Sequence, residues 1–371
     1  MRKIAIALTT SLLFAACGGS SNSDTAPSNN GIPLAEVPAA LAKSACDVFA
    51  RCNKLFYPIV FAVTDCTATV TAQFTEATFN DLERVVTDGT ANYNALLGKQ
   101  CVDAVEAGDC SVFDNNLPAA CRQAFTGTVA AGGDCTMAQE CSDPDSRCDT
   151  SAGVCPGKCA PRSSAGVDCQ VNEDCALGLV CAKLTSKCTA PPKEGEPCGG
   201  TVNEDCAGGL ICVGDDKASM TPGACQSQDT VLVAASGSDC SIKHGPMCQV
   251  GLSCVITTLT ADLNGKCQPP GAASSACNIS IPSQCPVGQF CPLTLTQALA
   301  GMTANCTDLP AENDSCAPNT SLSVCGKDLI CDSSKTCAKR SELGQTCMRD
   351  DECVSNHCIN GGCSSVSACP I

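Results

Sequence analysis

The residues of this chain with the greatest capacity for chemistry are its cysteines, which make up 37 of its 371 residues. Cysteine thiolates bind zinc, exchange with disulfides and attach haem, and proteins with these functions commonly space them as C-x-x-C. The closest two cysteines here are Cys155 and Cys159, so that spacing does not occur. A chain this rich in cysteine is instead typical of a disulfide scaffold. We therefore predict disulfide bonds, with no metal site and no cofactor.

Residues suited to acid–base or nucleophilic catalysis are scarce. Histidine occurs at His244 and His357 alone, and we interpret His357, beside Cys358, as a surface loop residue. The motifs G-x-S-x-G and H-E-x-x-H and a glycine-rich phosphate-binding loop do not occur in the sequence. The sequence therefore predicts no catalytic residues. The alternative of an enzyme would require residues 33–127 to hold the activity.

Acidic residues form short clusters that could bind calcium weakly, because calcium prefers oxygen ligands from loops. We favour a second interpretation, in which acidic residues before a cysteine cap turns and keep the chain soluble. No twelve-residue EF-hand loop is present, and the formal net charge of −16 opposes binding to nucleic acid. The clusters are Asp143 with Asp145, Glu173 with Asp174, Glu204 with Asp205, Asp215 with Asp216, and Asp350 with Asp351 and Glu352.

The first residues have the organisation of a secretory signal: two positive charges precede thirteen largely apolar residues. That stretch is shorter than the roughly 20 residues a membrane-spanning helix needs. Small residues before Cys17 and the Gly/Ser/Asn run after it closely resemble a bacterial lipoprotein signal, although Phe14 stands where leucine is usual. The resemblance implies a signal peptide at 1–16, a lipid on Cys17, a flexible tether at 17–32 and, from Gly18, the outer membrane. Ordinary secretion without a lipid is the alternative.

Aromatic residues separate the mature chain into two regions that must fold differently. All of them except Phe290 lie before residue 126, so residues 33–130 are the part able to bury a conventional core. Apolar residues recur there at intervals of three or four, a spacing that indicates helices. We therefore predict a compact α-helical, disulfide-bonded domain over 33–130. The expected helical stretches are residues 34–56, 65–86, 91–107 and 117–125.

From residue 131 onward the chain repeats a four-cysteine unit. Two copies, NEDCALGLVC at 172–181 and NEDCAGGLIC at 203–212, match at eight of ten positions. Aligning the remaining sequence on this motif gives seven units, whose first cysteines lie 29 to 42 residues apart, a spacing typical of a repeat array. The units lack aromatic residues for a core, so disulfides must stabilise them. We predict seven small tandem modules with little regular structure over 131–371, joined by Pro/Gly-rich linkers into an extended, semi-rigid string.

The cysteines can be assigned to these regions, although fifteen pairings are open in the helical domain. Cys159 and Cys369 are left over: they either extend the first and last modules or close a longer link, and the sequence does not decide. Length varies most between the third and fourth cysteines of a module, so we expect the variable contact surface there. The helical domain holds Cys46, Cys52, Cys66, Cys101, Cys110 and Cys121. Modules 1 to 7 hold, in order, Cys135, Cys141, Cys148 and Cys155; Cys169, Cys175, Cys181 and Cys188; Cys198, Cys206, Cys212 and Cys225; Cys240, Cys248, Cys254 and Cys267; Cys277, Cys285, Cys291 and Cys306; Cys316, Cys325, Cys331 and Cys337; and Cys347, Cys353, Cys358 and Cys363.

The last module has a cysteine pattern that resembles a known repeat. GQTC at 344–347, DDEC at 350–353, Cys358 and GGC at 361–363 are similar to the cysteine-rich repeats of the Dickkopf N-terminal type, which are abundant in surface lipoproteins of myxobacteria. AACRQAFTGTV at 119–129 resembles the helical segment that precedes the repeats in that group. The resemblance implies that the first cysteine of a module pairs with the third and the second with the fourth. It also implies an envelope-anchored interaction protein.

These observations together predict a non-enzymatic, lipid-anchored binding or adhesion protein exposed on the bacterial outer membrane. Its contact with the membrane would be the lipid on Cys17. Its partner at the cell surface is expected to be a protein, because the modules lack the aromatic surfaces that glycan and nucleic-acid recognition commonly use. The alternative is a structural envelope or coat component without a specific ligand.

Overall fold

The computed structural model divides the chain into two compact units. The described residues of Met1–Cys52, Cys66–Pro191 and Ser341–Ile371 form unit 1, and those of Asn53–Asp65 and Pro192–Arg340 form unit 2. Unit 1 contains modules 1, 2 and 7 with the helices, so the change of architecture near residue 130 is not the boundary between units. The structure describes residues 31–61, 65–150, 155–202, 205–216, 219–241, 245–258, 264–278, 280–281, 283–286, 288–293, 297, 302–316, 325–326, 329–332, 334–359 and 361–365.

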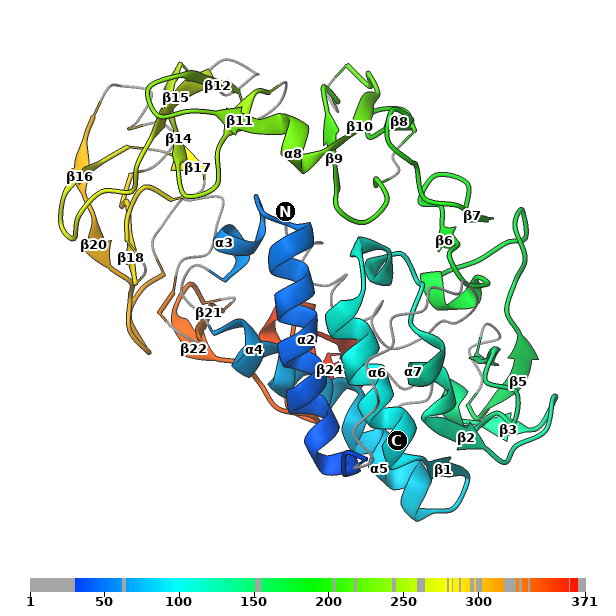
Figure 1. Cartoon of the computed structure of the whole chain (residues 1–371). Coiled ribbons are helices and arrows are strands. Elements are labelled where there is room, and N and C mark those ends of the chain that lie inside the picture. Colours follow the sequence, from blue (N-terminus) through cyan, green and yellow to red (C-terminus); the bar gives the residue numbers. More distant parts are fainter. Residues whose placement is uncertain are drawn as a thin grey trace. The chain divides into compact units, whose positions relative to one another are not determined.

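Helices form the N-terminal part of unit 1. Helix α2 (Val37–Cys52) buries Leu41, Ala45 and Phe49 along one face, the pattern expected of an amphipathic helix. It packs against both α4 and α6, as Figure 1 shows. The other helical elements of this part are η1 (Leu34–Glu36), α4 (Cys66–Phe74), the π-helical η2 (Thr75–Phe79), α5 (Asn80–Thr87), α6 (Ala95–Ala107), η3 (Cys110–Phe113) and α7 (Ala119–Gln123).

The start of the predicted helix at 91–107 is a strand instead. The Asn94 side chain accepts hydrogen bonds from the N–H groups of Leu96 and Leu97 at 3.1 and 3.2 Å, so it caps α6 at its N-terminus. The residues before this cap form β1 (Ala91–Tyr93), which pairs antiparallel with β2 (Phe125–Gly127). A side-chain cap therefore decides where helix gives way to strand.

An apolar core and three disulfides hold the helices together. Val48, Phe74, Leu82 and Val85 are at most 1% exposed. The disulfides resolve the pairing that the sequence left open, and each of them joins two elements of the helical domain. They are Cys46–Cys66, Cys52–Cys110 and Cys101–Cys121.

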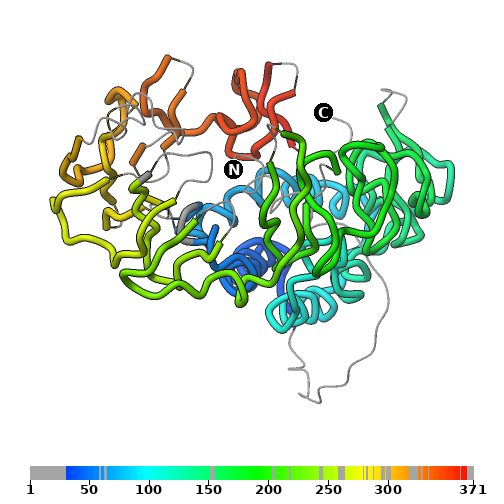
Figure 2. The backbone as a smooth tube through the Cα atoms, turned by 90° about the horizontal axis from the view of Figure 1, so that it is seen from above, coloured from blue at the N-terminus to red at the C-terminus, as the bar shows by residue number. Residues whose placement is uncertain are grey.

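The modules share one covalent frame. In each of the seven, the first cysteine is bonded to the third and the second to the fourth, across 10 to 21 residues. The N–H of the fourth cysteine donates to the carbonyl of the residue two before the first cysteine, as Cys188 does to Val167. The residue three before the first cysteine always has a positive φ, which suits glycine and asparagine. Figure 2 shows the resulting narrow, looped backbone segments.

Module 1 departs from the predicted assignment. Its fourth cysteine is Cys159, not Cys155: Cys141 is bonded to Cys159, and the Cys159 N–H makes the bond to Gly133 that marks the fourth position. Cys155, which was assigned to the module's own frame, is also disulfide-bonded, but not within this pair of bridges. The assignment was wrong because spacing alone gave no way to choose between two cysteines four residues apart.

Regular structure in the modules consists of short strands and turns. In unit 1 these are β3 (Asp134–Cys135), η4 (Ala138–Glu140), β4 (Ser146–Asp149), β5 (Gly157–Pro161), η5 (Asn172–Asp174), β6 (Val180–Cys181), β7 (Cys188–Thr189), η6 (Asp350–Glu352), β23 (Cys358–Ile359) and β24 (Gly362–Cys363). In unit 2 they are β8 (Pro197–Cys198), β9 (Leu210–Val213), β10 (Gly223–Ser227), α8 (Gln228–Val231), β11 (Leu232–Ala234), β12 (Asp239–Ser241), β13 (Met247–Cys248), β14 (Ser253–Thr258), β15 (Asn264–Gln268), β16 (Ala276–Cys277), β17 (Ser280–Ile281), β18 (Gln289–Phe290), β19 (Ala304–Asn305), β20 (Thr307–Asp308), β21 (Leu329–Cys331) and β22 (Cys337–Lys339).

The third and fourth cysteines of a module lie on an antiparallel hairpin. Strands β9 and β10 pair in module 3, where Cys212 faces Cys225, and β14 and β15 pair in module 4, where Cys254 faces Cys267. In module 4 this hairpin is extended to the four-stranded sheet β12-β15-β14-β17, whose last strand belongs to module 5. The loop between these cysteines can change length because the disulfides fix its base.

Among the described residues of unit 2, one apolar cluster contains no cysteine. Ile211, Val213, Val231, Leu232 and Met247 form it, and they come from modules 3 and 4. The segment between α2 and α4, which includes α3 (Tyr57–Val60), adds Leu55 to this cluster and places Phe56 against it. The predicted helical stretch 34–56 is therefore wrong at its end: α2 stops at Cys52, and Phe56 packs in unit 2.

Candidate functional site

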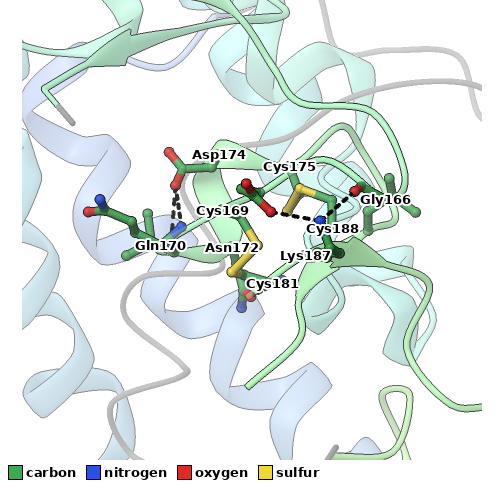
Figure 3. Close-up of a disulfide and its surroundings, with 12 residues drawn as sticks. Gly166, Cys169, Gln170, Asn172, Asp174, Cys175, Cys181, Lys187 and Cys188 are labelled. Atoms are coloured by element: carbon green, nitrogen blue, oxygen red, sulfur yellow. Dashed lines mark hydrogen bonds and ion pairs between the residues drawn. A yellow bond between two sulfur atoms is a disulfide. The ribbon is translucent and has the colours of Figure 1, made fainter. Parts of the chain in front are cut away.

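Module 2 shows how the repeated motif is built (Figure 3). Disulfides Cys169–Cys181 and Cys175–Cys188 form its centre. Between them, η5 is capped by Asp174, whose carboxylate accepts the N–H groups of Gln170 and Val171 at 2.8 and 3.2 Å. The module is therefore a rigid frame whose polar side chains serve its own backbone.

The acidic residue before the second cysteine has this capping function in other modules as well. In module 1, Glu140 accepts hydrogen bonds from the N–H groups of Thr136 and Met137 at 2.5 and 3.1 Å. Although burial favours its neutral form, these hydrogen bonds lower the pKa of Glu140. In module 7, Glu352 accepts the Met348 N–H at 2.7 Å. These contacts match the turn-cap interpretation, because in each of these three modules the carboxylate accepts hydrogen bonds from backbone N–H groups.

Cysteine sulfurs lie close enough together in each module to look like a metal site. In module 1, for example, the Sγ atoms of Cys135, Cys141 and Cys159 lie within 4.8 Å of one another. Each of them belongs to a disulfide, and a disulfide sulfur lacks the thiolate charge that binds metal ions. The clusters therefore reflect two bridges packed against each other.

Asn115 joins the helical domain to module 2, a contact that the sequence analysis did not predict. Its side chain is 1% exposed, and its Nδ2 donates to the carbonyls of Asn172, Cys175 and Leu179 at 3.1 to 3.3 Å. Its own carbonyl accepts the Gly178 N–H. Asn115 has a φ of 58°, a conformation that asparagine tolerates better than most residues. The available signal was an Asp-Asn-Asn turn before α7, which resembled an ordinary loop.

Arginines connect the helical domain with modules 1 and 2. Arg122 of α7 pairs with Asp145 at 2.6 Å, and Arg147 of module 1 pairs with Asp174 of module 2. Arg162, between these modules, donates to the Glu173 carbonyl at 2.6 Å. Burial lowers the pKa of Arg162 and raises that of Glu173. Modules 1 and 2 are thus attached to the helices, in contrast to the predicted free string.

Module 7 contains a histidine that is less accessible than predicted. His357 is partly buried, and its Nε2 is buried without a hydrogen-bond partner among the described residues. Burial lowers its pKa, against the opposing charge of Asp350. Such an imidazole stays neutral at pH values where an exposed histidine is partly charged.

Every cysteine predicted to be disulfide-bonded is bonded. The signal peptide, Cys17, Cys369 and His244 lie outside the described residues, as do parts of the hairpin loops in modules 3, 4 and 5. Within the described part of the chain, no helix has the length and apolar character needed to cross a membrane. No known protein family, no curated protein and no solved structure matches this chain.

Proposed function

We propose that this chain is a non-enzymatic binding or adhesion protein, anchored by a lipid at Cys17 and displayed on the bacterial outer membrane. The observation that supports binding best is the distribution of exposed apolar side chains. Among the described residues, Leu96 is the one large apolar residue of the helical domain that is strongly exposed. The modules expose ten, among them Leu184 at 62% and Met348 at 77%. Exposed apolar side chains on a rigid frame favour a protein partner.

Modules 2 and 7 are the best candidates for the binding surface. Module 2 exposes Val167, Val171 and Leu184, and module 7 exposes Leu343, Met348 and Ile359. A disulfide-bonded module presents such side chains at little cost in conformational entropy, because its backbone is already fixed.

The test is a cell-binding assay with the mature protein and matched variants. Replacing Leu184 and Met348 by serine should lower binding at least tenfold if the modules are the contact surface. Leu96→Ser, an equally apolar change on the helical domain, should leave binding unchanged. Equal binding by all variants, with disulfides intact, would contradict the proposal. A loss caused by Leu96→Ser alone would place binding on the helical domain.

The anchor has its own test. Cys17→Ala should move the protein from the membrane fraction to the medium or periplasm. Protease added to intact cells should release module fragments if the array faces outward.

A lipid on Cys17 also leaves Cys369 as the remaining cysteine for Cys155, since Cys155 is bonded and all others are paired. Peptide mapping without reduction should then recover a Cys155–Cys369 peptide, and a free Cys369 would contradict the lipid.

A structural envelope component is the second candidate. Its support is the repeated frame, which could form a layer through many weak contacts. It would be favoured if deletion of the protein altered surface integrity while cell binding stayed the same.

A further inference from the structure

One segment of the helical region packs on modules 3 and 4. We call residues 53–61 the finger. It leaves the end of α2 at Cys52, and the chain returns to the helices at Cys66. Both of these cysteines are bonded within the helical domain, to Cys110 and Cys46. The finger contains no cysteine, so its contacts with modules 3 and 4 are noncovalent.

The apolar part of this contact is small and well buried. Leu55 is 8% exposed and lies in the cluster of Ile211, Val213, Val231, Leu232 and Met247, with Phe56 packed against it. The cluster residues of the modules are at most 9% exposed while Leu55 is in place. Removal of the finger would expose part of this apolar surface to water, which is unfavourable.

Polar contacts orient the finger on the same surface and pair a positive charge with a negative one. The Leu55 N–H donates to Oε1 of Gln228 at 3.3 Å, and Nε2 of Gln228 donates to the Gly209 carbonyl at 3.2 Å. Gln228 is only 4% exposed, so both ends of its amide are held in one orientation. The Lys54 ammonium lies 2.5 Å from Asp229, at the first turn of α8. The surface therefore contacts the ammonium of Lys54, the backbone N–H of Leu55 and the apolar side chains of Leu55 and Phe56.

We propose that this surface of modules 3 and 4, defined by Gln228, Asp229 and the apolar cluster, is a peptide-binding site that the finger occupies within the same chain. Its partner is a protein segment with a lysine followed by two large apolar residues. This inference rests on the proposed binding function and adds a second recognition site, on modules 3 and 4, to the surface of modules 2 and 7. A tethered finger competes at an effective concentration in the millimolar range, so the site binds external peptides weakly until the finger leaves.

The test uses the full mature protein and a fluorescent peptide with the sequence NKLFY of residues 53–57. Leu55→Ser with Phe56→Ser frees the site without changing modules 3 and 4, and should bind the peptide at least tenfold more tightly than the unmodified protein. Lys54→Glu is a milder variant whose apolar contacts remain, and it should give a smaller increase. Adding Asp229→Lys to the double variant should weaken binding of NKLFY and strengthen binding of NELFY.

Several outcomes would overturn the inference. One is the absence of saturable binding by a double variant that keeps its disulfides and its thermal unfolding transition. Another is equal affinity for NKLFY and a scrambled peptide. A dimer of the unmodified protein that the double variant cannot form would make a second copy the occupant. Cell binding that persists when peptide binding fails would overturn this site while leaving the proposed function in place.

Discussion

The helical domain and the modules bury different kinds of residue. In the helical domain the most buried side chains are apolar, such as Phe74 and Leu82, and disulfides fasten helices that already have a core. In module 2 the buried cluster consists of Cys169, Cys175 and Cys188, with Leu179 partly buried beside them. One chain therefore uses disulfides in two ways. They reinforce the core of the first region and replace it in the second.

Phe74→Ala is expected to change stability more than any other substitution considered below. The ring is fully buried, so its loss should lower the free energy of unfolding of the helical domain by about 3 to 5 kcal/mol. Leu96→Ala, at a side chain that is 42% exposed, is the control and should change stability little. Chemical denaturation followed by helical circular dichroism measures both. A small effect of Phe74→Ala would mean that disulfides, not burial, hold the helices.

Removal of one module disulfide is the next largest change. Cys175→Ser with Cys188→Ser opens a bridge across 13 residues, which the chain-entropy account values at about 3 kcal/mol. Module 2 has little apolar burial to compensate, so it should unfold locally while the helices persist. Hydrogen exchange should show loss of amide protection in β6 and β7. The matched pair of substitutions, Cys101→Ser with Cys121→Ser, should destabilise the helical domain without unfolding it. If each pair of substitutions unfolded its own region, the two regions would not differ in their dependence on disulfides.

The Asn115 contact tests how far module 2 depends on the helical domain. Asn115→Gly keeps the positive φ accessible but removes the amide that donates to three backbone carbonyls of module 2. We expect a loss of about 1 to 3 kcal/mol at this junction. Asn116→Ala, which removes an amide bonded to the Ser111 hydroxyl, is the control. Faster exchange at Gly178 in the first variant alone would support the junction, whereas equal exchange in both would contradict it.

Acid should lower the free energy of unfolding of module 7 through His357, and this is the smallest of the four expected changes. Burial lowers the pKa of His357 below its usual 6.5 in the folded protein. As pH falls below about 6.5, the unfolded module takes up a proton that the folded module does not, so the free energy of unfolding decreases. The decrease ends once pH passes the lowered folded pKa. His357→Gln should remove this pH dependence of hydrogen exchange in β23 and β24, and an unchanged profile in that variant would assign it to other groups.

Local rules explain the parts of the fold that sequence patterns predicted. Apolar residues at helical spacing indicated α2 up to Cys52, and the repeated cysteines indicated small disulfide-bonded modules with little regular structure, in which the structure adds short paired strands. The patterns failed where a residue's role depends on a distant partner. Phe56 continued the helical spacing of α2, yet it packs beside residues more than 150 positions later in the chain. Asn115 resembled a loop residue because its three acceptors lie about 60 residues away.

The residue types of this protein and their short spacing were enough to predict a scaffold of disulfide bonds. Its cysteine content, its repeat and its few catalytic side chains point to a disulfide scaffold, since these properties depend on residue type and short spacing. The three-dimensional fold was needed to show that Cys159 completes module 1, that Asn115 contacts module 2 and that Leu55 packs on modules 3 and 4. The physical reason is that pairing and docking depend on distances in space, and residues with the same local pattern differ only in what the fold brings beside them.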